Sequence, residues 1–210
     1  MLTYLHLELT HKGRQFRLKK SSTYNYVLAA FGAAIIAVLA QVSIPLPFSP
    51  VPITGQTLAV GLIVTILGTR LGTFSVLIYI LLGAVGLPVF SGMSGGFAIL
   101  VGPTGGYIVG FLVTAVIMGL YLDKFGITIF HAIIANLIGM VVTLAFGTAW
   151  LKVAADLSWT AAFMGGVAPF IVVGILKAVL AAWVGVTVRR RLESAHLISF
   201  SGLQTPAERN

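Results

Sequence analysis

Residues Gly83 to Gly110 read GAVGLPVFSGMSGGFAILVGPTGGYIVG, and this stretch decides the fold. The chain as a whole is apolar enough for a lipid bilayer, and this stretch is long enough to cross the bilayer once. Glycine and proline leave backbone groups without helical partners, which is costly in hydrocarbon. We therefore predict that the loop from Pro88 to Pro103 dips back into the protein and lines a small-molecule site. The alternative is a long glycine-rich surface hairpin between two helices.

The composition predicts an integral membrane protein. Of 210 residues, 58% are hydrophobic and 9% are charged, and the mean hydropathy is +1.04. The chain has no cysteine and its four histidines show no ligand spacing, so neither a metal nor a cofactor is predicted. The net charge of +8 comes from tails and short turns beside apolar spans, a pattern typical of topology determinants and not of nucleic-acid binding.

Hydropathy predicts an all-α fold, namely a membrane bundle of six transmembrane helices with a re-entrant glycine-rich outer loop between the third and fourth. A basic tail at 1–20 precedes the membrane domain at 21–192, and a second tail follows at 193–210. The six helices are expected at 24–44, 55–69, 72–87, 104–122, 127–150 and 161–188.

The basic residues predict the orientation of this bundle. The N-terminal cluster, Arg70, Lys124 and the run 189–191 fall on one side, whereas Lys152 is alone in a loop on the other. By the positive-inside rule, both termini are cytoplasmic. The outer loops are then 45–54, 88–103 and 151–160.

Lys177 is the most informative single residue, because it lies about ten residues from either end of the last predicted span. A lysine at mid-helix costs on the order of 3 kcal/mol or more to insert, and such residues usually face a partner inside the bundle. None of the five acidic residues of the chain lies within a span. The predicted counter-ion is therefore a ligand carboxylate, with backbone carbonyls as the fallback. The alternative is a neutral or snorkelling lysine.

Two amides inside the predicted spans are further candidates for ligand binding. Asn136 has both a donor and an acceptor for a ligand amide or ureide, and Gln56 lies at the outer end of the second span. An interhelical hydrogen bond is an equally good interpretation of either residue.

The chain carries no recognisable catalytic or nucleotide-binding motif. It has no phosphate-binding loop, and neither a nucleophile triad nor a paired carboxylate stands out. We therefore predict a binding protein and not an enzyme. A self-sufficient carrier or channel and a membrane enzyme are the competing classes, and the lack of an intramembrane acid weighs against a proton-coupled carrier.

Small residues recur along the first predicted helix. Ala29, Ala33 and Ala37 are spaced by four, with Ala30 and Ala34 beside them. Such stripes allow two helices to approach closely in lipid. They predict either packing within the bundle or docking onto another membrane protein.

Three motifs resemble one known family. The runs SPVPITGQT at 49–57, LLGAVGLPVF at 81–90 and GPTGGY at 102–107 are similar to those of BioY proteins, and the resemblance covers nearly all of residues 25–190. BioY proteins are the biotin-specific S components of bacterial energy-coupling-factor (ECF) vitamin transporters. The resemblance implies six membrane helices in the plasma membrane, an outward pocket closed by the first and third loops, a membrane-embedded coupling (T) subunit and two cytosolic ATPase subunits.

The resemblance also implies which residues bind biotin, with another carboxylate-bearing vitamin as the rival ligand. The family frequently has an aspartate three residues before the lysine of the last helix, where this chain has Gly174. Together with the amides above, the predicted substrate-binding residues are Gln56, Ser91, Ser94, Gly95, Gly96, Thr104, Gly105, Gly106, Tyr107, Asn136 and Lys177.

Overall fold

The computed structural model describes residues 22–195 and residue 197. The tail predicted at 1–20 lies outside the described residues, as does most of the tail predicted at 193–210. The remainder covers the whole predicted membrane domain apart from its first residue.

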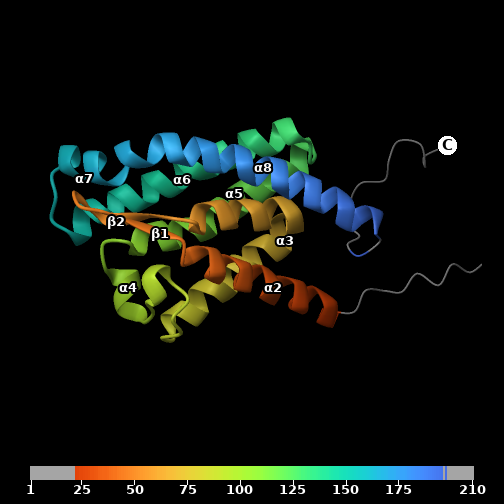
Figure 1. The fold of residues 1–210 in the computed structure, drawn as a ribbon, viewed down its shortest axis with the longest axis horizontal. Helices are drawn as coiled ribbons and strands as arrows, with labels where there is room; N and C mark the ends of the chain where they lie inside the picture. The colour runs from red at the N-terminus through yellow and green to blue at the C-terminus, as the bar shows by residue number, and fades with distance from the viewer. Residues whose placement is uncertain (1–21, 196, 198–210) are drawn as a thin grey trace, which may run out of the picture.

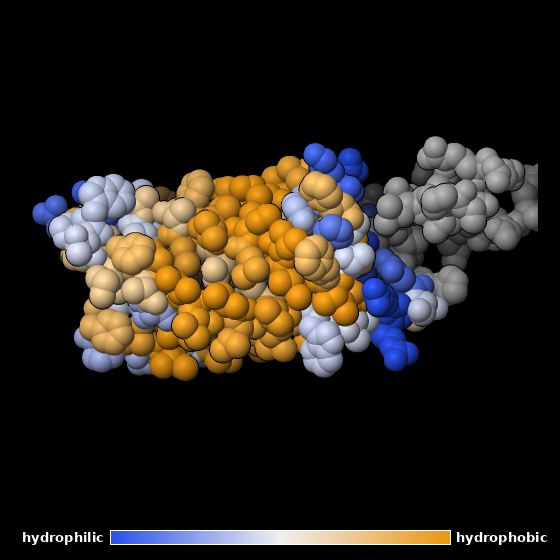
Figure 2. Space-filling model, turned by 90° about the horizontal axis from the view of Figure 1, so that it is seen from above, coloured by the Kyte–Doolittle hydropathy of each residue, from blue (hydrophilic) through white to orange (hydrophobic). Residues whose placement is uncertain are grey.

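Long apolar helices form most of the structure (Figure 1). Within the described residues, five helical segments are long and apolar enough to cross a membrane. Figure 2 shows a broad hydrophobic band across the middle of one face, with hydrophilic residues gathered toward its two ends. The long helices are α2 (Ser22–Ala40), α3 (Gln56–Ala84), α5 (Gly105–Phe125), α6 (Ile129–Ala154) and α8 (Ile171–Ser194), and the shorter α7 (Trp159–Gly166) precedes α8.

Helix α3 contains both helices predicted at 55–69 and 72–87. It breaks at Gly68, whose φ of 76° and ψ of −175° are not helical. A side chain would be strained at this positive φ, so glycine is suited to the break. Figure 1 shows that the second arm of α3 runs back at an angle to the first.

The last predicted helix, 161–188, is also interrupted. After α7 a short 3₁₀ turn at Ala168–Phe170 leads into α8. Pro169 has no N–H group for a helical hydrogen bond, which accounts for the break.

The segment between α2 and α3, which contains the outer loop predicted at 45–54, is a β-hairpin. β1 (Ser43–Leu46) pairs antiparallel with β2 (Ser49–Thr54), and Ser43 lies opposite Thr54. The long elements are all helices, as predicted, and this hairpin is a local departure from the all-α fold. The first helix ends at Ala40 instead of residue 44. The four prolines at 45, 47, 50 and 52 exclude a helix and leave extended backbone, which pairs through the remaining N–H groups.

The glycine-rich loop after α3 folds back onto that helix. Phe90 is 1% exposed, and its ring packs edge-on against Tyr79 at 5.5 Å between centroids. The ring fits because Gly83 has no side chain, since a Cβ there would lie 2.1 Å from it. The loop also contains a 3₁₀ turn, η1 (Ser91–Met93), and a five-residue helix, α4 (Phe97–Val101).

The alanines of α2 divide between two faces of the helix. Ala29 and Ala33 are 0% and 1% exposed, so they pack inside the bundle. The prediction that they contact a partner is therefore wrong, because no second protein reaches a side chain buried in its own bundle. Ala37 is half-buried against the core, whereas Ala30 and Ala34 are exposed.

The two ends of the bundle differ in structure. In Figure 1 the β-hairpin, α4 and α7 lie together at one end. The start of α2 and the end of α8 lie at the other end. Residues of β2 and α4 in the first group line the candidate site.

Candidate functional site

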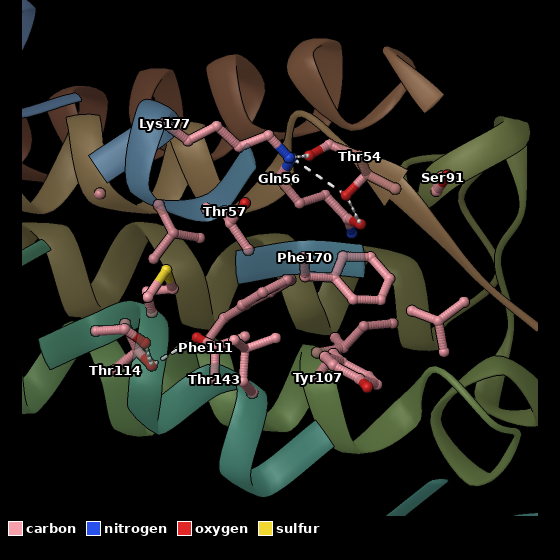
Figure 3. Close-up of a pocket in the computed structure, with 18 of the residues that line it drawn as sticks. Thr54, Gln56, Thr57, Ser91, Tyr107, Phe111, Thr114, Thr143, Phe170 and Lys177 are labelled. Carbon is pink, nitrogen blue, oxygen red and sulfur yellow. Dashed lines mark hydrogen bonds between the residues drawn. The ribbon is translucent and has the colours of Figure 1, made fainter. Parts of the chain in front are cut away.

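A cavity of about 270 Å³ lies among the helices, lined by residues of β2, α3, the glycine-rich loop, α5, α6, the 3₁₀ turn at 168–170 and α8. Its size is close to the lower limit for small-molecule sites, roughly 300 Å³. In the view of Figure 3, Lys177, Thr54 and Gln56 lie on one side and Thr114 and Thr143 on the other. Aromatic rings lie between them, so the cavity has two polar walls and an apolar middle.

Lys177 enters the cavity from α8. Its Nζ donates a 2.6 Å hydrogen bond to the main-chain carbonyl of Thr54 in β2 (Figure 3). No carboxylate of the described residues forms an ion pair with it. The backbone carbonyl that we predicted as the fallback partner is thus present, and a carboxylate in the cavity would supply the missing negative charge.

Gln56 lies on the same wall, at the start of α3, and is 6% exposed. Its Nε2 donates to the hydroxyl of Tyr79 at 2.6 Å, and its Oε1 accepts from the hydroxyl of Thr54 at 2.8 Å. The amide therefore ties the hairpin to both arms of α3, because Tyr79 lies in the second arm.

Three further buried polar side chains line the cavity. The hydroxyl oxygens of Thr114 and Thr143 are 2.8 Å apart, and Thr114 also donates to the carbonyl of Gly139 at 3.2 Å. Asn136 donates to the hydroxyl of Thr65 in α3 at 3.2 Å, so the interhelical hydrogen bond we weighed is present. Asn136 also lines the cavity, so the two interpretations are compatible.

Aromatic side chains form the apolar middle of the cavity. Phe111 and Phe170 line it, and the rings of Tyr107 and Phe170 are 6.4 Å apart. The hydroxyl of Tyr107 donates to the carbonyl of Gly166 at 2.9 Å. This bond fixes the ring and connects α5 to the end of α7.

The structure brings seven of the predicted residues to this one cavity and leaves four outside its lining. The seven are Gln56, Ser91, Ser94, Thr104, Tyr107, Asn136 and Lys177. The four are Gly95, Gly96, Gly105 and Gly106, and for them the prediction of a place along the cavity is wrong.

These four glycines serve packing and backbone conformation. A Cβ on Gly95 or Gly105 would lie 2.3 or 1.8 Å from a main-chain carbonyl oxygen, and one on Gly106 would lie 2.1 Å from the Cβ of Trp150. Gly96 has a φ of 101°, which other residues rarely adopt. Gly105 and Gly106 instead line a separate apolar groove beside Trp150.

Several lining residues were missed from the sequence. Thr114 and Thr143 are polar residues inside apolar spans, the same signal that singled out Asn136. A threonine is ordinary in a membrane helix, where its hydroxyl bonds to the backbone, so the signal is weaker. The others missed include Thr54, Thr57, Phe111 and Phe170.

Two side chains hold the glycine-rich loop against the cavity, Gln41 directly after α2 and Ser43 of β1. Gln41 donates from Nε2 to the carbonyls of Val89 and Phe90 at 3.3 and 3.2 Å, and its Oε1 accepts from the N–H of Met93 at 2.8 Å. The hydroxyl of Ser91 donates to Ser43 at 2.8 Å. These contacts place Phe90 and Ser91 at the cavity wall.

Among the described residues, no group of three His, Asp or Glu side chains is close enough to hold a metal ion. The cavity lining supplies a cation, amides, hydroxyls and aromatic rings.

The fold and this cavity are those of a small-molecule binding protein of the membrane. The chain belongs to the BioY family, whose model matches residues 12–194. It is 41% identical to biotin transporter BioY2 of Lactococcus lactis subsp. cremoris over 175 residues, 83% of this chain and 95% of that protein. It is 42% identical to biotin transporter BioY of Rhizobium etli over 173 residues, 78% of this chain and 92% of that protein.

A solved structure matches the fold as well. The crystal structure of the S-component for biotin from an ECF-type ABC transporter superposes with a TM-score of 0.75 and 29% sequence identity. The match covers 80% of this chain and 92% of that one.

Proposed function

We propose that this protein binds biotin and carries it across the bacterial plasma membrane as the S component of an ATP-driven ECF transporter. The observation that carries the proposal is Lys177, which faces the cavity without a carboxylate partner among the described residues. Biotin has a carboxylate, an apolar chain and a cyclic urea, which match a cation, aromatic rings and polar side chains. The names of the relatives support this ligand.

Another carboxylate-bearing vitamin is the second candidate, and Gly174 is the observation that favours it. Gly174 lines the cavity where the family frequently has an aspartate, and a Cβ there would lie 2.5 Å from the sulfur of Met140. Met140 thus occupies the space beside Gly174, which gives this wall an apolar surface.

In this proposal the chain crosses the membrane six times with both termini in the cytoplasm. The two arms of α3 make two of the crossings, and the glycine-rich loop re-enters from outside. At 1.5 Å per residue, arms of about 12 and 16 residues are shorter than a hydrocarbon core of about 30 Å. Short crossings leave room at the outer end for the hairpin and the loop, which cover the cavity.

A membrane-embedded T subunit and two ATPase subunits complete the proposed transporter, because the chain has no phosphate-binding loop. Ala30 and Ala34 lie on the exposed face of α2 beside large apolar side chains such as Phe31, which is 64% exposed. Small residues on an apolar helix face permit close approach of another helix. This face is therefore the proposed docking surface for the T subunit.

The docking surface is tested by two tryptophan substitutions one residue apart. Ala34→Trp is expected to abolish pull-down of the T subunit and biotin uptake while the purified variant binds biotin normally. Ala33→Trp, on the buried face, is expected to prevent folding and so to remove biotin binding as well. Normal uptake by a well-folded Ala34→Trp variant would contradict the assignment.

The ligand is tested by isothermal titration of the purified protein with biotin, and with pantothenate and nicotinate as other carboxylate-bearing vitamins. We expect tight binding of biotin alone. If another vitamin binds tightly and biotin does not bind, that vitamin is the ligand of the protein and biotin is not. No binding of any of them would overturn the proposal.

A further inference from the structure

The side-chain amide of Asn136 has a direction that its hydrogen bonds determine. Asn136 is 5% exposed, and its Nδ2 donates to the hydroxyl oxygen of Thr65 at 3.2 Å and to the carbonyl of Ala132 at 2.8 Å. The hydroxyl of Thr65 donates its own proton to the carbonyl of Gly61 at 2.7 Å. Thr65 and Ala132 therefore offer only acceptors, so the NH₂ group must point to them.

The oxygen of the same amide has no such partner. Both N–H groups of Asn136 are used, and its Oδ1 accepts no hydrogen bond from the described residues. Oδ1 lies against Gly61, where a Cβ would be only 2.0 Å away. Gly61 and Asn136 both line the cavity, so the missing side chain at Gly61 leaves the oxygen room at the cavity wall.

An amide oxygen that faces a cavity loses access to water when a ligand fills the cavity. A site that then leaves the oxygen unpaired selects for ligands with an N–H group. We propose that Asn136 Oδ1 accepts a hydrogen bond from an N–H group of the bound ligand, and that Thr65 is the positioning residue that fixes the amide. With biotin as the ligand, on which this inference rests through the proposed function, the donor is an N–H of the cyclic urea. The amide presents an acceptor alone and not the donor and acceptor together that the sequence suggested.

The experiment compares biotin with two cyclic carbamate analogues, in each of which an oxygen replaces one urea N–H group. One carbamate is expected to bind the parent protein roughly 10- to 100-fold more weakly than biotin, because an oxygen then faces Oδ1. In Asn136→Ala, biotin binds more weakly and the same carbamate binds about as well as biotin. Equal binding of biotin and both carbamates to the parent would overturn the inference, as would an unchanged preference in Asn136→Ala.

Thr65 gives a second test in which Asn136 is retained. Thr65→Val is expected to reduce the preference for biotin over the carbamate several-fold, and Thr65→Ser, which keeps the hydroxyl, is expected to restore it. A merely structural role would lower the melting temperature of Thr65→Val and leave the preference unchanged, which would overturn the positioning role. Thr187→Val is the matched control, because that hydroxyl donates to the carbonyl of Trp183 on the exposed side of α8. A parent protein that fails to bind biotin would overturn the proposed function itself, together with this inference.

Discussion

Lys177 and Arg189 lie twelve residues apart on α8 and make similar contacts at its two ends. Lys177 donates to the carbonyl of Thr54 at 2.6 Å, and Arg189 donates to the carbonyl of Ile66 at 3.2 Å. Arg189 is also paired with Glu193, from Nε to Oε1, at 2.8 Å. Lys177 has no such acid among the described residues. The charge of Arg189 is thus compensated by an acidic side chain of the protein, whereas the charge of Lys177 faces the cavity without one.

The difference separates a structural cation from a ligand-binding one. Arg189 reaches the carbonyl two residues before the break at Gly68 and is 5% exposed, so it stabilises a helix end. Lys177 contacts the hairpin that covers the cavity. Substitutions at the two positions should therefore affect different measurements.

The largest effect is expected at Lys177. Lys177→Ala should weaken biotin binding by about 2–5 kcal/mol, because the ligand carboxylate loses its partner in a site of low dielectric. Lys177→Arg should weaken it less. Isothermal titration of the purified variants provides the measurement, and Lys152→Ala is the control, since Lys152 lies over the ring of Trp159 outside the cavity. Unchanged affinity in a well-folded Lys177→Ala variant would contradict the ligand-binding role of Lys177.

A smaller effect of a different kind is expected at Arg189. Arg189→Met should lower the free energy of unfolding by about 1–3 kcal/mol. The substitution removes the buried guanidinium group that pairs with the half-exposed carboxylate of Glu193 and donates to the carbonyl of Ile66 near a helix end. Biotin affinity should stay at the parent value. Thermal unfolding in detergent and titration of the same sample measure both quantities. A loss of affinity as large as that of Lys177→Ala would contradict the structural role.

The sequence predicted the positions of the long helices and Lys177 because both depend on polarity alone. A cation in an apolar span is visible without a structure, and the same holds for Asn136. The hairpin was not predicted, since the prolines exclude a helix without indicating which strand pairs with which. The glycines were misinterpreted because close packing and ligand contact both require glycine, and only the neighbours, such as Trp150 beside Gly106, distinguish the two.

The smallest predicted effect concerns the contacts that close the cavity at the Lys177 end. Gln41→Leu removes three hydrogen bonds to the glycine-rich loop. It should speed biotin release roughly tenfold, because about 0.5 kcal/mol per net bond lost in a half-buried site adds up to about 1.5 kcal/mol. The melting temperature of the protein without biotin should also fall, because the same three hydrogen bonds hold the loop there. Stopped-flow release of a fluorescent biotin derivative tests this. Ser158→Ala is the matched control, because Ser158 caps α7 without touching the loop. Equal release rates in the parent protein and Gln41→Leu would contradict the claim that these hydrogen bonds keep the glycine-rich loop closed over the cavity.

The most direct measurement of the central claim is a structure of this protein purified with saturating biotin. We predict biotin in the cavity lined by Lys177, Asn136, Thr114 and Thr143, with a hydrogen bond to Lys177 Nζ. Biotin bound in the apolar groove beside Trp150, or an empty cavity in protein that binds biotin in solution, would contradict the claim.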